Sequence, residues 1–114
     1  RMQGKSDDSA ARLREQAQAV VHAGAELLVL ESMPAALAGE ITRALPIPTI
    51  GIGAGAECDG QVLVCYDLLG LTPGRRPKFS KDFLVGRGSV RDAFAAYAED
   101  VRAGRFPGPE QIAG

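Results

Sequence analysis

Glu31 is the residue whose type and position most clearly suggest chemistry. It follows the apolar run of residues 27–30, which predicts a parallel strand covered by helices on both faces. Ligands of parallel α/β sheets bind at the carboxyl ends of the strands. Partial desolvation there would make a carboxylate a better general base near neutral pH. A structural carboxylate, which caps a helix or pairs with an arginine, is the alternative.

Three glycines lie at and after the end of a second apolar run. Gly51, Gly53 and Gly55 let residues 51–56 match the dinucleotide fingerprint G-x-G-x-x-A, but only weakly. The helix that the fingerprint requires does not begin at once, and no acidic residue lies at the spacing expected of a ribose partner. A loop through which the backbone approaches a ligand, with Gly53 and Gly55 as its contacts, and a tight turn are the other interpretations.

The remaining candidates carry weaker signals. Cys58 and Cys65 are seven positions apart with no histidine near them, which argues against a metal site. His22 falls inside a predicted helix and is expected to be a surface or packing residue. Asp59 belongs to an Asp-Gly turn pair, and it also has the option of facing the cleft at the strand ends.

Composition limits the classes of function. The chain has 114 residues, of which 46% are hydrophobic and 24% charged, and its net charge is −1. These values predict one folded domain without a basic nucleic-acid surface. A local basic cluster would either meet a polyanionic ligand tail or be a solvated loop; it comprises Arg75, Arg76, Lys78 and Lys81.

Cellular setting can also be predicted. No apolar run approaches the roughly 18–20 residues of a membrane span, and no signal segment opens the chain. Two cysteines are too few for a disulfide framework, so we expect a reduced, cytoplasmic setting. The chain begins with Arg1, which fits a processed product or a piece of something longer, and the body of the sequence favours the second.

Hydrophobic periodicity predicts alternating helices and strands. Residues 7–24 read as a helix with capping groups at Asp7, Asp8 and Ser9. A strand at 26–31, a helix at 34–45 and a strand at 48–53 follow. Short connections between such elements are typical of a parallel α/β sheet.

The second half of the chain is less regular. Residues 60–70 fit a strand or a helix capped by Asp59, and the α/β alternation favours the helix. A loop follows, with a possible short strand at 78–80. Ser89 is expected to cap a helix over 90–103. The Pro/Gly-rich end predicts a loosely ordered tail.

Several segments, taken in order, resemble the C-terminal part of the ketopantoate hydroxymethyltransferase family. They include Leu-Val-Leu-Glu-Ser-Met-Pro at 28–34 and Ile-Pro-Thr-Ile-Gly-Ile-Gly-Ala-Gly at 47–55; the others lie at 2–5, 59–64, 67–72, 77–79 and 97–107. The resemblance implies an α/β fold, the C-terminal part of a (β/α)8 TIM barrel. Residues 1–107 would be a portion of one barrel domain, and 108–114 a loosely ordered tail.

The resemblance also implies a reaction. Glu31 would be the proton acceptor, Mg²⁺ would polarise the keto acid, and 5,10-methylenetetrahydrofolate would donate the one-carbon unit. The metal ligands would come from earlier strands, so the isolated chain is expected to be inactive. A keto acid, a folate and either a homo-oligomer or the missing barrel half are the expected partners, with the 90–103 helix as a subunit contact.

Two further hypotheses remain open at this stage. One is another (β/α)8 enzyme that holds a phosphate at the glycine loop, residues 53–55. The other is a non-catalytic fragment that acts by assembly, because an unpaired strand edge and an uncovered apolar face favour association.

Overall fold

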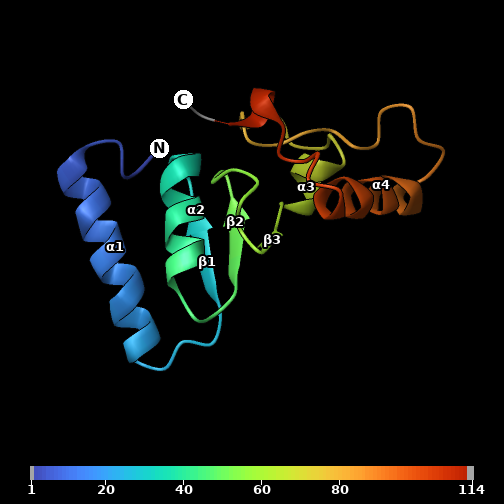
Figure 1. Cartoon of the computed structure of the whole chain (residues 1–114). Helices are drawn as coiled ribbons and strands as arrows, with labels where there is room; N and C mark the ends of the chain where they lie inside the picture. Colours follow the sequence, from blue (N-terminus) through green and yellow to red (C-terminus); the bar gives the residue numbers. More distant parts are fainter. Residues whose placement is uncertain (1, 113–114) are drawn as a thin grey trace.

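A computed structural model describes residues 2–112, in which two helices pack on one face of a short parallel sheet (Figure 1). The strands β1 (Leu28–Glu31), β2 (Thr49–Ile52) and β3 (Gly60–Gln61) lie side by side in that order. All pairs are parallel, with Leu28 opposite Thr49 and Ile50 opposite Gly60. The predicted α/β alternation is therefore confirmed for this part of the chain.

Helix α1 (Asp7–His22) begins with a capping box. The Ser6 hydroxyl accepts a hydrogen bond from the Ser9 amide, and the Ser9 hydroxyl accepts one from the Ser6 amide. Ser6 is thus the N-cap, and the two acids after it lie in the first turn, where they favour the helix dipole. The helix ends slightly before the predicted residue 24, since Gly24 takes a left-handed conformation.

Helix α2 (Ala35–Ala44) follows Pro34 and packs beside α1 over the sheet. Small residues of both helices, Ala10 and Ala17 of α1 and Ala38 of α2, are buried against the sheet. Helix and strand side chains form the first core, with Leu30 at 4% exposure. Its buried members are Ala10, Ala17, Leu30, Met33, Leu37, Ala38, Ile41, Leu45 and Ala54.

Residues 60–70 are neither one helix nor one strand. Gly60 and Gln61 pair with β2, and only Cys65–Leu68 form a helix, α3. The predicted helix over the whole segment is therefore wrong. Asp59 does not cap it, because its carboxylate accepts a hydrogen bond from the Thr49 amide and so draws Gly60 alongside β2.

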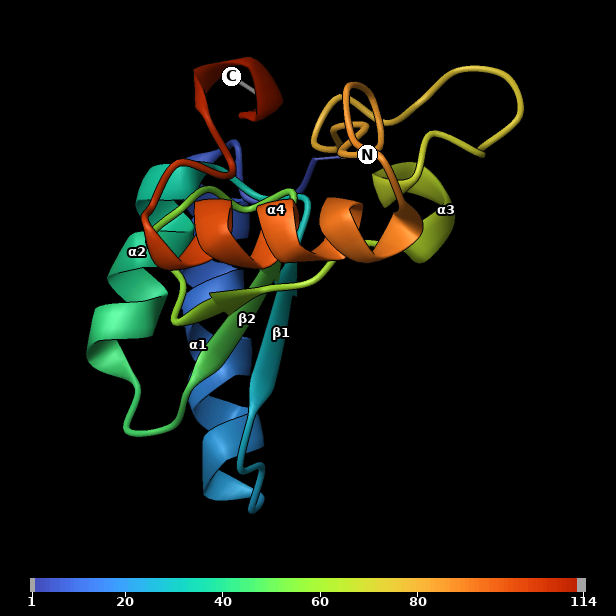
Figure 2. The ribbon, with the colours of Figure 1, turned by 90° about the vertical axis from the view of Figure 1, so that its right-hand side faces the viewer.

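A second, smaller core lies around α4 (Val90–Arg102), which Ser89 caps as predicted. Phe83, Tyr97 and Phe106 meet edge to face, with ring centroids 5.3–5.7 Å apart. Figures 1 and 2 place α4 on the side of the sheet opposite α1 and α2. Burial raises the pKa of Tyr97.

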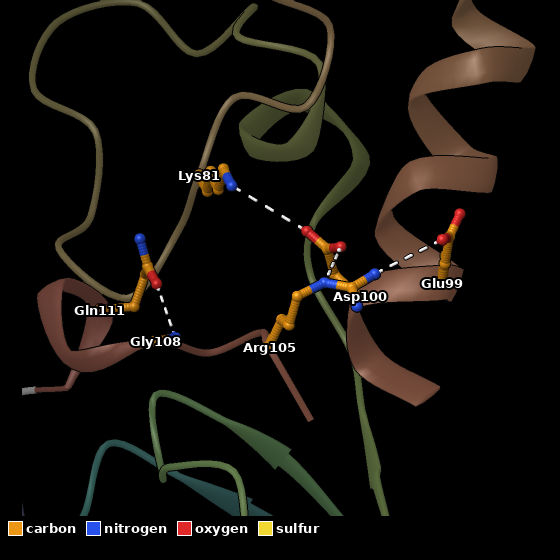
Figure 3. A network of polar contacts seen from close by, with 6 residues as sticks. All are labelled: Lys81, Glu99, Asp100, Arg105, Gly108 and Gln111. Carbon is orange, nitrogen blue, oxygen red and sulfur yellow. Dashed lines mark hydrogen bonds and ion pairs between the residues drawn. The ribbon is translucent and has the colours of Figure 1, made fainter. Parts of the chain in front are cut away.

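The segment around residue 80 differs from expectation. Residues 78–80 turn rather than extend, because Ser80 bonds the Pro77 carbonyl through both its amide and its hydroxyl. The predicted strand at 78–80 is therefore wrong. In the tail, Pro109–Gln111 form a 3-10 helix, η1. The Gln111 side chain is buried and accepts from the Gly108 amide at 2.7 Å (Figure 3).

Ion pairs join the end of α4 to its surroundings (Figure 3). Arg105 lies 3.0 Å from Asp100 and 3.5 Å from Glu99, and Lys81 lies 4.0 Å from Asp100. Together with the Gln111 hydrogen bond, these contacts are the polar ones around the end of α4 and η1. Residues 113–114 of the predicted tail lie outside the described part. In residues 2–112, no helix has the length and apolar character to cross a membrane.

Candidate active site

Glu31 is the last residue of β1, at the carboxyl end of the sheet. Side chains alternate along a strand, and Leu30 points into the first core. Val29 and Glu31 therefore face the other way, onto what we call the open face, the sheet face away from α1 and α2. Ile50 and Ile52 pair with them in register and provide apolar neighbours on that face.

The surroundings of Glu31 differ from the prediction in one respect. Its side chain is exposed, and Val29 beside it is 50% exposed. The expected desolvation is therefore absent, because residues 2–112 do not provide a layer over the open face at this strand. For the same reason, the prediction of a strand covered on both faces is correct for one face only.

A groove of about 270 Å³ runs along the outer edge of β1, the edge not paired with β2. Glu31 lies in its lining. Apart from Glu31 and Gln16, the lining is apolar, with Leu13, Ala17 and Val20 from α1 and Val29 from β1 among its members.

The loop after β2 lies next to the segment after β1. The Ser32 amide donates to the Ile52 carbonyl at 2.9 Å, and the Met33 amide donates to the Gly53 carbonyl at 3.2 Å. Gly53 and the residues after it are thus held against the chain that leaves Glu31. The two strand ends form one connected region.

Gly53 and Gly55 are closely packed against other residues. A Cβ on Gly53 would lie 2.8 Å from the Phe79 ring, and a Cβ on Gly55 would overlap Ala35. Both residues have positive φ, 67° and 83°. Protein side chains thus occupy the space beside the two glycines, which favours a packing role over a phosphate cradle.

Phe79 was not singled out by residue type or spacing. It comes from the long loop after α3, yet its ring lies against Gly53 at the carboxyl end of β2. Only the Pro-Lys-Phe segment of the family resemblance drew attention to it. No local periodicity could predict this contact, because it joins residues 26 positions apart.

The other predicted polar candidates do not join Glu31. Asp59 accepts from the Thr49 amide at 2.8 Å, and Thr49 begins β2, so Asp59 lies at the amino end of the sheet. It does not face the strand-end cleft. His22 is exposed at the last residue of α1, as expected of a surface residue. Asp67 is buried and accepts a hydrogen bond from Thr72.

The basic cluster is mostly solvated. Arg75, Arg76 and Lys78 are exposed in the loop after α3. Lys81 lies 5.1 Å from the centre of the Phe83 ring and also approaches Asp100. Lys81 therefore has a structural role at the second core, and the arrangement favours a solvated loop over an anion site.

The two cysteines have different environments. Burial raises the pKa of the Cys58 thiol, while neighbouring Thr49 and Thr42 hydroxyls oppose this shift. Cys65 is exposed at the start of α3. The two are free thiols.

We expect Cys58 to react with a maleimide about tenfold more slowly than Cys65 at pH 7.5, because Cys58 is half-buried and its pKa is raised, whereas Cys65 is exposed. Mass spectrometry of the single variants Cys58→Ser and Cys65→Ser gives the two rates separately. Equal rates at all pH values would contradict the different environments.

Comparison with known proteins adds a family to this geometry. Residues 1–109 match the family described as "Ketopantoate hydroxymethyltransferase". Proteins named "3-methyl-2-oxobutanoate hydroxymethyltransferase" from Ralstonia pickettii (strain 12J) and Burkholderia mallei (strain SAVP1) are each 56% identical over 110 residues. The matches cover 96% of this chain, but only 40% and 41% of those relatives. The chain thus spans about two fifths of their length.

Proposed function

Because the chain belongs to the ketopantoate hydroxymethyltransferase family, we propose that it supplies the proton acceptor of an enzyme that transfers a one-carbon unit to a small keto acid. One observation carries the proposal. Glu31 lies at the carboxyl end of a parallel strand, on the open face and beside apolar side chains. This is where ligands of parallel α/β sheets bind.

The proposed chemistry starts with a proton transfer. The Glu31 carboxylate takes the proton from C3 of 3-methyl-2-oxobutanoate, and the C–H electron pair forms an enolate. The enolate carbon bonds to the methylene carbon of 5,10-methylenetetrahydrofolate, and both C–N bonds of that carbon break. Water supplies the hydroxyl group on that carbon. The two folate nitrogens take up the proton from Glu31 and the remaining proton of water, so that tetrahydrofolate leaves and 2-dehydropantoate forms. Covering the open face would desolvate Glu31 and strengthen it as a base.

The residues of this chain do not fit the Mg²⁺ site that the resemblance implies. Within residues 2–112, no three His, Cys, Asp or Glu side chains lie close enough to share an ion. Asp59 and Asp67 are already engaged by Thr49 and Thr72. The proposal therefore places the magnesium ligands outside this chain.

We further propose that the sheet is a sector of a (β/α)8 barrel. Leu28 and Ser32 direct their amides toward the β2 segment, so the amides of Val29 and Glu31 point to the outer edge of β1. Leu27 and Val29 are 52% and 50% exposed beside that edge. A neighbouring strand and the rest of a barrel would cover these groups. They would come either from a chain that carries the missing half of the barrel or from further copies of this chain in a homo-oligomer.

A chimaera tests the proposed function. It consists of the R. pickettii relative with its 110 matching residues replaced by this chain. We expect it to exchange the C3 proton of 3-methyl-2-oxobutanoate in D₂O with Mg²⁺ and without folate, as followed by proton NMR. The isolated chain should show no exchange above background.

The unmodified relative is the control for this experiment. If it exchanges the proton and a folded chimaera does not, this chain lacks the proposed base. The assembly hypothesis would then be favoured, since the chain would complete a barrel without restoring turnover.

A further inference from the structure

Ser32 has an unusual backbone conformation directly after Glu31. Its φ is 51°, and it is the one non-glycine residue with positive φ among residues 2–112. L-residues with a side chain disfavour this region, and serine has no special preference for it. Such conformations persist when the surroundings impose them, and they concentrate at functional sites.

Hydrogen bonds fix the peptide groups on both sides of Ser32. Its amide donates to the Ile52 carbonyl at 2.9 Å, and its carbonyl accepts from the Gln3 amide at 2.7 Å. The next amide, of Met33, donates to Gly53. The bonds thus come from two different segments, the end of β2 and the segment before α1.

The backbone of Ser32, rather than its hydroxyl, makes these contacts. Within the described residues the Ser32 hydroxyl makes no hydrogen bond, whereas its amide and its carbonyl are both hydrogen-bonded. An extended residue 32 would continue β1. The left-handed residue instead turns the chain, so that Met33 enters the first core and α2 begins after Pro34.

We propose that Ser32 is a positioning residue for Glu31. Its left-handed backbone, locked by Gln3 and Ile52, ends β1 at Glu31 and sets the direction in which the carboxylate leaves the strand. The expected effect on catalysis rests on the proposed function, whereas the effect of Ser32 on the direction of Glu31 does not. It also gives the segment before α1 a role, because the Gln3 amide holds one side of the turn.

Two substitutions separate the backbone from the hydroxyl. Ser32→Gly removes the hydroxyl and accepts positive φ, whereas Ser32→Thr keeps a hydroxyl and disfavours positive φ through its β-branch. In the chimaera we expect Ser32→Gly to retain wild-type kcat for C3 proton exchange. Ser32→Thr should lower kcat about tenfold, the ratio to which the backbone strain of a residue held at positive φ corresponds. The KM should change little.

A second measurement does not depend on activity. Amide hydrogen exchange at Gln3 should be about tenfold faster in Ser32→Thr than in wild type, and unchanged in Ser32→Gly. The ¹³C shift of the Glu31 carboxylate should move only in the threonine variant. Should Ser32→Thr fail to fold, Ser32→Asn and Ser32→Ala replace the pair, since asparagine tolerates positive φ better than alanine.

The outcomes decide between the two proposals. A moved ¹³C shift of the Glu31 carboxylate together with a lower kcat in Ser32→Gly would assign the role to the hydroxyl and overturn the inference. Wild-type values in Ser32→Thr would overturn it as well. If no variant, wild type included, exchanges the C3 proton, the proposed function fails. The amide exchange and the carboxylate shift then still decide whether Ser32 positions Glu31.

Discussion

Glu31→Gln in the chimaera is expected to slow C3 proton loss from 3-methyl-2-oxobutanoate by about 10²–10⁴-fold, the contribution typical of a positioned general base. Glutamine keeps the shape of the side chain but cannot accept the proton. Proton NMR in D₂O, without folate, measures this step before any carbon–carbon bond forms. The KM for the keto acid should change less than kcat.

The structure gives a reason to expect a folded variant. Glu31 is exposed and has no side-chain hydrogen bond or ion pair to another described residue, so the substitution leaves no partner unsatisfied. Glu26→Gln is the matched control, because Glu26 is also exposed and lies shortly before the same strand. Exchange rates within threefold for wild type and Glu31→Gln would remove Glu31 as the base.

Features that depend on neighbouring residues in the sequence were predictable. The hydrophobic periodicity from residue 7 onward predicts the helix α1. The apolar run before Glu31 predicts that this residue lies at the end of a strand. The N-cap of α4 was recognisable because serine at this place bonds an amide three residues further on. Each of these features is decided within one turn or one strand.

Features that depend on distant residues were not predictable. Gly60 and Gln61 form a strand because β2 pairs with them, although the local sequence also fits a helix. The left-handed Ser32 is held by Gln3 and Ile52, which lie far from it in sequence. The exposure of Glu31 depends on what covers the open face, which the run before it cannot specify.

In the glycine loop, too, the local sequence left alternatives open that only contacts with distant residues decide. Its pattern suggested a ligand-binding loop, a dinucleotide fingerprint or a turn, and only the packing distinguishes them. Phe79 and Ala35 lie against Gly53 and Gly55, and neither partner is near them in sequence. A substitution that adds one methyl group therefore tests whether packing is the reason for glycine.

Gly55→Ala is expected to lower the free energy of unfolding of the chain by about 2–4 kcal/mol, the sum of left-handed strain and overpacking. The added Cβ would overlap that of Ala35 and lie 3.0 Å from its Cα, which belongs to the backbone of α2 and cannot rotate away. Urea unfolding followed by circular dichroism measures the change.

Gly74→Ala separates the two causes, because Gly74 also has positive φ, 76°, but nothing lies within 4 Å of its added Cβ. It should cost only about 1 kcal/mol, the strain alone. Ala35→Gly should recover part of the loss in Gly55→Ala, since it removes the overlapping methyl group. If Gly55→Ala costs no more than Gly74→Ala, the close approach to α2 is not what requires glycine, and a ligand at the loop becomes the better explanation. If Gly55→Ala lowers the free energy of unfolding more than Gly74→Ala does, and Ala35→Gly restores part of it, the loop packs against the start of α2. The loop would then also stabilise the turn that follows Glu31.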